Sequence, residues 1–194
     1  MPKPRGLSKN SIWMFISFGL LAVLVLVVLF KTTPSGNSKN NSSTTKTFQS
    51  SKYGFSISYP DSWGVLNKNG LAKLQNNFVF ALVKRTPGAL FGVKIQKSKA
   101  AGVKLEEVAQ ALDKELPKTF NNFSKINQEN INVSNLEALK YNYTFSSKQG
   151  LKTWEQLVII PTPKKVYHLT AWTSLREAAE KNEISKIVSS FKVY

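Results

Sequence analysis

Few side chains in this 194-residue chain could carry reaction chemistry. There is no cysteine, and His168 is the single histidine. These counts exclude disulfides, iron–sulfur clusters, thiolate zinc sites, cysteine nucleophiles and histidine-rich metal centres within one chain. His168 follows Tyr167 in a segment predicted to be a strand, and a catalytic base would also need a nucleophile and an orienting group. We recognise no such set, so we expect His168 to be packed or hydrogen-bonded and the chain not to be an enzyme. An uncharacterised hydrolase is the weakest alternative.

The remaining charged motifs also predict no reactive centre. The sequence contains no G-x-S-x-G, Walker or G-x-G-x-x-G motif. The acidic groups are interspersed with lysine, as is typical of solvated helix faces: Glu106 with Glu107, Asp113 with Glu115, and Glu177, Glu180 and Glu183. The basic pairs Lys84-Arg85 and Lys164-Lys165 lack interleaved aromatic residues. We therefore predict no metal ion and no cofactor, and we do not expect nucleic acid as a partner.

The net charge is strongly positive and unevenly distributed. The chain has 27 basic and 11 acidic residues, a net charge of +16. Residues 1–50 contain six of the basic residues and none of the acidic ones, which leaves a net charge of +10 for residues 51–194. Two interpretations stay open: a solvated lysine-rich surface, or attraction to an anionic partner such as a wall polymer or lipid headgroups.

Residues 12–30 form an uncharged apolar run that predicts a transmembrane helix. As a helix the run would be about 28 Å long, close to the ~30 Å hydrocarbon core of a bilayer. It follows a short basic tail, residues 1–11, and Trp13 stands at its edge, where indoles favour the interface. The alternative of a cleaved signal peptide requires a shorter run and a nearby small-x-small site. A pilin-type leader normally carries a glutamate at the position of Ser11. We therefore predict an uncleaved anchor.

The basic residues on the two sides of this run are nearly balanced, so orientation rests on the short N-terminal tail. We predict a single-pass cell-membrane protein with a cytoplasmic N-terminus and an extracytoplasmic C-terminal domain. Residues 31–46, rich in Ser, Thr and Asn, predict a flexible linker that spans roughly 20–25 Å. Residues 47–194 then form the folded domain.

Hydrophobic patterning in the domain predicts an α+β fold with a mostly antiparallel sheet flanked by helices. Strands are indicated where apolar and polar residues alternate, at 55–59, 91–95 and 139–145, and in the apolar runs 78–83 and 157–160. A further strand is predicted at 166–173. Short connections rich in turn residues lie between consecutive strands, and such short connections favour antiparallel pairing. Residues 105–116 predict an amphipathic helix ended by Pro117. The capping-box pattern of Ser174 and Glu177 predicts the start of a second helix. The polar stretch 180–183 interrupts its apolar positions, so the segment forms either one helix or two short ones.

The segment YGFSISYPDSW, residues 53–63, resembles the opening signature of the PsbP family. The ending IVSSFK, residues 187–192, is similar to the last helix of that family, and the elements between follow its order. The resemblance covers residues 47–194 and implies a PsbP-like α/β/α sandwich. One departure is Asn135, where such proteins often carry glycine before a strand. Asparagine tolerates a positive φ, so the turn is expected to survive.

The signature residues have structural interpretations of their own: Tyr53, Gly54, Phe55, Tyr59, Pro60 and Trp63. Tyr53 and Gly54 turn the chain into a strand, Phe55 and Tyr59 point to one face, and Pro60 ends the pairing because it lacks an N–H. Trp63 is expected to fold back over the core as a buried residue.

The resemblance implies a non-catalytic, membrane-tethered extracytoplasmic module that binds or stabilises a membrane or envelope protein complex. The alternative is a module that binds an anionic ligand, wall polymer or lipid headgroups, through its basic surface.

Overall fold

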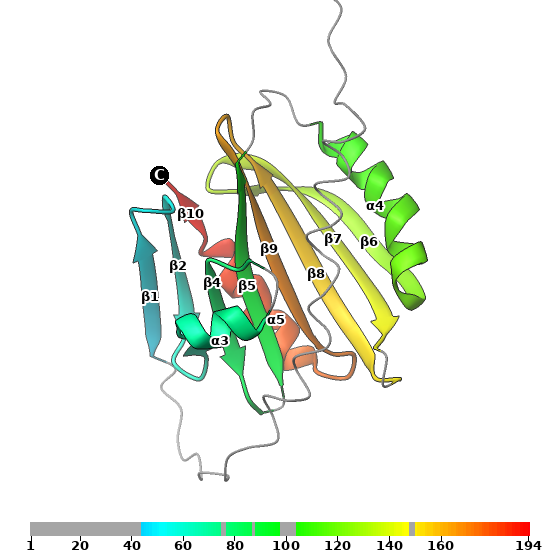
Figure 1. The fold of residues 1–194 in the computed structure, drawn as a ribbon, viewed down its shortest axis with the longest axis horizontal. Coiled ribbons are helices and arrows are strands. Elements are labelled where there is room, and N and C mark those ends of the chain that lie inside the picture. Colours follow the sequence, from blue (N-terminus) through cyan, green and yellow to red (C-terminus); the bar gives the residue numbers. More distant parts are fainter. Residues whose placement is uncertain (1–43, 75–76, 87, 98–103, 148–149) are drawn as a thin grey trace, which may run out of the picture.

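A seven-stranded antiparallel sheet forms the centre of the domain (Figure 1). The computed structural model describes residues 44–74, 77–86, 88–97, 104–147 and 150–194. The sheet has the order β3-β4-β5-β9-β8-β7-β6. Its strands are β3 (Gly64–Val65), β4 (Phe80–Lys84), β5 (Ala89–Lys97), β6 (Asn121–Val133), β7 (Leu136–Ser146), β8 (Lys152–Pro161) and β9 (Lys165–Ser174). The predicted α+β class with mostly antiparallel pairing is therefore confirmed.

A small second sheet has the order β1-β2-β10. It consists of β1 (Thr45–Ser50), β2 (Phe55–Pro60) and β10 (Lys192–Val193). Because β1 begins at Thr45, the first strand includes the last two residues of the predicted linker. The predicted transmembrane helix 12–30 lies outside the described residues. Among the helices that the structure describes, none combines the length and the apolar character that crossing a membrane requires.

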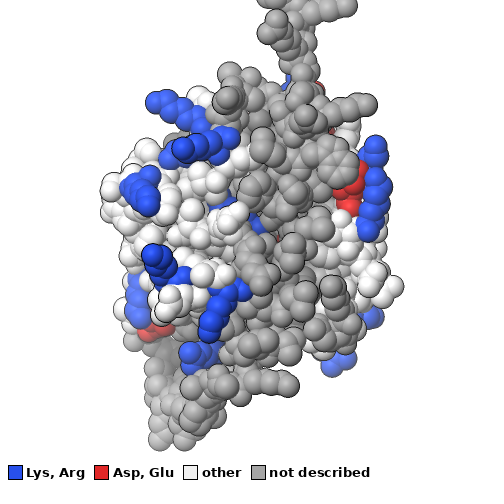
Figure 2. Space-filling model, viewed as in Figure 1, with Lys and Arg blue, Asp and Glu red and all other residues white. Residues whose placement is uncertain are grey.

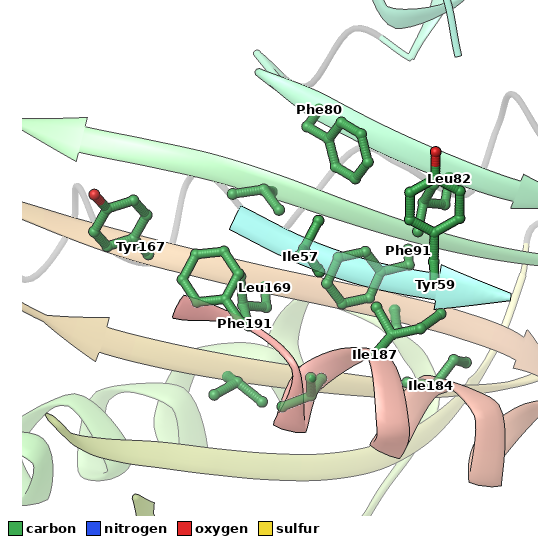
Figure 3. Packing of buried hydrophobic residues seen from close by; sticks show 14 of the residues in the cluster. Ile57, Tyr59, Phe80, Leu82, Phe91, Tyr167, Leu169, Ile184, Ile187 and Phe191 are labelled. Carbon is green, nitrogen blue, oxygen red and sulfur yellow. The ribbon is translucent and has the colours of Figure 1, made fainter. Parts of the chain in front are cut away.

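The two faces of the large sheet carry different elements (Figure 1). On one face lie α3 (Lys68–Lys73) and α4 (Leu105–Thr119), and on the other face lie α5 (Ala178–Ser189) and the small sheet. Apolar side chains of β2, the large sheet and α5 point toward one another between these layers (Figure 3). The residues drawn there include Ile57, Tyr59, Phe80, Leu82, Phe91, Leu169, Ile184, Ile187 and Phe191. Each large apolar side chain buried in this core contributes roughly 1.5–3 kcal/mol.

Three predictions about helix boundaries are wrong, two of them at Pro117 and Asn69-Gly70 and the third at the start of the C-terminal helix. Pro117 lies inside α4, which continues to Thr119. A proline this close to a C-terminus removes one intrahelical hydrogen bond, and the last turn still closes because Phe120 N–H donates to the Leu116 carbonyl at 3.0 Å. Asn69-Gly70, predicted as a turn, belongs to α3, whose N-terminus is capped by Asn67.

The C-terminal helix is a single helix that begins after Glu177, not after Ser174. The predicted capping box therefore does not form, and Glu177 is the N-cap residue without a side-chain capping bond. The polar stretch 180–183 lies within the helix, and its two glutamates bind Lys84 of the large sheet. The stretch marks a polar contact between layers instead of a break.

The edge strand β6 carries no apolar alternation and was not predicted. Most of its residues are exposed, including Ile126, and its pairing with β7 is interrupted by two register shifts. Such irregularities in an edge strand hinder pairing with other chains. At the turn between the two strands, Asn135 has φ +61°, which confirms the expectation that asparagine supplies the positive φ there.

Candidate functional site

Four of the family-signature residues are buried (Gly54, Phe55, Tyr59 and Trp63), and the other two, Tyr53 and Pro60, are half-buried beside the core. Phe55, Tyr59 and Trp63 are buried, and the ring of Phe55 stacks on Phe191 with the centroids 5.2 Å apart. The backbone N–H of Trp63 donates to the Pro60 carbonyl at 3.0 Å and closes a turn at the end of β2. This geometry is the one that a structural role requires.

The turn at Tyr53-Gly54 is held by the C-terminus and by β9. Gly54 has φ +72°, and a Cβ atom there would lie 2.9 Å from the Tyr194 carbonyl oxygen, so glycine is required. The Tyr53 carbonyl accepts hydrogen bonds from Tyr167 Oη at 2.9 Å and from Lys165 Nζ at 2.7 Å. The Tyr194 N–H donates to the Gly54 carbonyl at 3.2 Å, so the signature turn is tied both to β9 and to the residue after β10.

A charged network connects Trp63, at the other end of the signature segment, to β4 and α5. Lys84 Nζ lies 3.1 Å from Glu180 Oε1 and 2.9 Å from Glu183 Oε2, and Trp63 Nε1 donates to the same Glu183 oxygen at 2.7 Å. Burial by itself lowers the pKa of Lys84, but the hydrogen bonds and charges of Glu183 and Glu180 outweigh it and raise that pKa above 10.5. Lys84, one of the basic pair Lys84-Arg85, therefore has a structural role, because it joins β4 to α5.

The buried polar groups with the greatest capacity for chemistry lie on the face of the large sheet that carries α3 and α4. We call Lys94, Tyr143, Glu155, His168 and Thr170 the polar strip. They come from the four adjacent strands β5, β9, β8 and β7, and all five are buried. Strand register places Lys94 opposite His168 and Glu155 opposite Tyr143. Because directly opposite residues share a face, the strip crosses the middle of the sheet.

Aromatic and apolar groups border the polar strip. A Cβ atom at Gly92 would lie 2.3 Å from Phe78 Cε1, so the absence of a side chain lets the Phe78 ring lie against the sheet. Lys94 Nζ then lies 4.7 Å from the centre of that ring, within cation–π distance. Trp172 of β9, which lies opposite Glu155 of β8, also packs against Phe78.

Burial shifts the titration of three groups in the strip. Loss of hydration lowers the pKa of Lys94 to about 8, against the opposing attraction of Glu155. Loss of hydration raises the pKa of Glu155 to about 8, although the Tyr143 hydroxyl and the Lys94 charge favour its carboxylate. Burial and the nearby Lys94 lower the pKa of His168 to about 3, so the imidazole is neutral at pH 7. Perturbed groups gathered in this way are typical of binding or catalytic sites.

Sequence reasoning found only one member of the polar strip, His168, and it expected a packed residue there. Lys94 lies at a polar position of the alternating strand 91–95, and such a position usually faces solvent. The structure buries that side as well, with 3% of Lys94 exposed. Among the described residues, no group of three or more His, Cys, Asp or Glu side chains could hold a metal ion.

Comparison with known proteins identifies the family of this chain. A family model described as PsbP-like protein matches residues 29–193. The chain belongs to the PsbP-like protein family. That match extends over the described domain and confirms the resemblance seen in residues 53–63 and 187–192.

Solved structures with the same fold as this PsbP-like protein share little sequence with it. LpqN of Mycobacterium tuberculosis, involved in cell envelope biogenesis, is 16% identical with a TM-score of 0.56, over 79% of this chain and 92% of LpqN. Cyanobacterial PsbP, CyanoP, from Synechocystis sp. PCC 6803 is 15% identical with a TM-score of 0.57, over 83% of this chain and 98% of CyanoP. A search of curated proteins gives no significant match. At these identities the neighbours show the fold alone.

Proposed function

We propose that this PsbP-like protein is a non-catalytic, membrane-tethered extracytoplasmic module that binds and stabilises a membrane or envelope protein complex. The observation that carries the proposal is the family match over residues 29–193, next to an apolar run at 12–30 that suits a membrane anchor. The similarity of fold to LpqN, a protein of envelope biogenesis, supports an envelope partner. The predicted linker would let the domain reach such a partner near the membrane.

A lysine-rich side of the domain favours a second candidate function, the binding of an anionic wall polymer or lipid headgroups. Figure 2 shows basic side chains gathered where Figure 1 places β1, β2 and α3. Lys46 on β1, Lys52 after β1, and Lys68 and Lys73 on α3 are exposed. They form none of the salt bridges found among the described residues. Surface charge of this kind attracts anionic polymers, and the attraction weakens with salt.

One affinity purification separates the two functions. The tagged full chain, extracted from membranes in mild detergent, should retain a protein partner through washes of increasing salt. A chimera of residues 1–46 fused to an unrelated soluble domain is the matched control, since it keeps the anchor and the linker. Loss of every partner at moderate salt would favour the anionic ligand, and equal enrichment by the chimera would contradict a role for the domain.

The proposed orientation is tested by protease accessibility. With the domain outside the membrane, protease added to intact cells from which any outer layers have been removed should digest residues 47–194 and leave a protected N-terminal fragment. Detection with tags at both termini distinguishes the fragments, and a cytoplasmic protein serves as the control for lysis. Protection of the C-terminal tag in intact cells would reverse the orientation.

A further inference from the structure

One end of the domain lies opposite the point where the chain enters it. Thr45 begins β1 beside Pro60 at the end of β2, whereas the turn at residues 51–54 lies at the other end of these strands. Six residues of β1 separate the two ends by roughly 20 Å. The β8–β9 turn, the end of β5 and the C-terminus lie at the same end as the turn 51–54 (Figure 1). We call this end the distal end.

The distal end carries lysines without acidic partners. We call them the distal cluster, and they are Lys52, Lys97, Lys164, Lys165 and Lys192. All of them are exposed except Lys165, which is half-buried. The eleven acidic residues of the chain all lie in the part that the structure describes, and the salt bridges found there include none of these lysines. Basic side chains are also visible at this end in Figure 2. The acidic side chains of the chain therefore do not neutralise the cluster.

Strand pairing brings two of these positive charges together. Lys97 lies directly opposite Lys165 in the β5–β9 pair, so both side chains leave the sheet on the same face. Lys165 Nζ is held 2.7 Å from the Tyr53 carbonyl oxygen, and Lys52 Nζ lies 5.2 Å from the centre of the Tyr53 ring. Like charges at directly opposite positions destabilise a sheet. Because a bound anion would offset this cost, the arrangement favours an anionic ligand.

An exposed aromatic ring lies beside the cluster on the outer face of the small sheet. Val193 packs against the core, so its neighbours Lys192 and Tyr194 point outward. Tyr194 is 58% exposed, and its hydroxyl donates to the Phe55 carbonyl at 2.9 Å, which ties the end of the side chain to β2. Ser56, opposite Lys192, places a hydroxyl on the same face. An aromatic ring with hydroxyl neighbours suits a sugar ring, which has C–H groups on its faces and hydroxyl groups around its edge.

We propose that the distal cluster binds a linear anionic polysaccharide of the cell envelope, with its phosphate or carboxylate groups on the lysines and a sugar ring on Tyr194. This inference rests on the second candidate function above and narrows it to one surface and one class of ligand. A polymer suits the surface better than a bilayer does, because the proposed tether enters at the opposite end, at Thr44. The cluster then faces away from the membrane.

The first experiment measures the binding of soluble polymers to the full chain held in nanodiscs of phosphatidylcholine, a neutral lipid. Phosphomannan and polygalacturonate carry phosphate and carboxylate groups on sugar chains, polyphosphate carries charge without sugar, and dextran carries sugar without charge. At least one of the two anionic polysaccharides should bind, and dextran should not. The affinity should fall about tenfold or more when the salt concentration is raised from about 0.05 to 0.3 M.

The second experiment locates the site with two variants that lose the same charge. The distal variant combines Lys52→Gln, Lys97→Gln, Lys164→Gln and Lys192→Gln, and the control variant combines Lys46→Gln, Lys68→Gln, Lys73→Gln and Lys152→Gln. All eight lysines are exposed, so both variants should keep the fold and nearly the same melting temperature. The distal variant should bind the polysaccharide about tenfold more weakly or worse, and the control variant should stay within about threefold of the unmodified protein.

Tyr194→Leu tests the contact with the sugar ring. It should weaken binding of the anionic polysaccharide by about three- to tenfold and leave binding of polyphosphate unchanged. Tyr194→Phe keeps the ring and should bind as the unmodified protein does. An equal loss of affinity for polyphosphate, or no loss for the polysaccharide, would show a polyanion held by charge alone.

Three further results would overturn the assignment. The first is that neither anionic polysaccharide binds. The second is that the control variant loses as much affinity as the distal variant, which would keep the second candidate function but move it to another surface. The third is that added vesicles of phosphatidylglycerol bind through the same four lysines as tightly as the polysaccharide, which would make the cluster a membrane contact. Purification of a protein partner is independent of all these results.

Discussion

Trp63→Ala is expected to destabilise the domain by about 3–5 kcal/mol, a large part of the roughly 5–15 kcal/mol that holds a domain folded. Only 1% of the Trp63 side chain is exposed, so truncation leaves a cavity beside β2. It also removes the indole donor to Glu183. The melting temperature of the full chain in detergent should fall by roughly 6–20 °C, measured by far-ultraviolet circular dichroism.

Val65→Ala is the matched control for Trp63. Val65 lies two residues further along the chain and is 47% exposed, so its truncation should change stability by about 0.5 kcal/mol or less. A rival view makes Trp63 an aromatic contact for a partner, as at many protein interfaces. Under that view Trp63→Ala would leave the melting temperature within a degree or two of the unmodified protein while partner binding is lost.

Lys84→Met is expected to cost roughly 2–4 kcal/mol. Removing one member of a fully buried ion pair costs about 3–5 kcal/mol, and the figure is lower here because Lys84 and Glu183 retain some exposure. Most of this cost comes from Glu180, because its side chain is only 4% exposed and its buried charge would no longer be paired with a lysine. Urea unfolding of the full chain in detergent measures the difference.

The stabilisation from Lys84 should also depend on pH in one direction. The pKa of this lysine is raised in the folded protein, so its contribution is complete below about 10.5 and declines as the pH rises through the folded value. The difference between the unmodified protein and Lys84→Met should therefore be constant near neutral pH and shrink in strong alkali. Lys118→Met is the control, since Lys118 is exposed and its ion pair with Glu115 contributes about 0.5 kcal/mol. A cost for Lys84→Met no greater than that of the control would contradict a structural role for the network.

Elements with a complete hydrophobic period were predictable from the sequence. The apolar positions of the helix 105–116 are the residues that α4 buries, because a helix with one covered face must repeat its apolar residues every three to four positions. The strand 55–59 was visible for the corresponding reason at a period of two. In contrast, β6 lies at the sheet edge with most side chains in solvent, and such a strand leaves no pattern to detect.

The polar strip could not be predicted, because the alternation of apolar and polar residues along a strand shows only that one face of the strand is apolar. It does not report whether the polar face meets solvent or another layer. Lys94 and Glu155 lie on strands of different parts of the sequence, and only the pairing of β5, β9 and β8 brings them to the same face. The boundaries at Pro117 and Ser174 were missed because local capping and breaking signals yield to tertiary contacts.

The small sheet makes the folding of β2 depend on residues that follow it by almost the whole sequence of the domain. β2 lies between β1, which precedes it, and β10, where Val193 pairs with Phe55 near the end of the chain. Until α5 and Phe191 have been synthesised, they cannot cover the apolar side of β2. Contacts this distant in sequence close slowly, and the uncovered strand is prone to aggregate in the meantime. A nascent chain of this protein therefore needs protection along β2 until α5 and β10 have emerged.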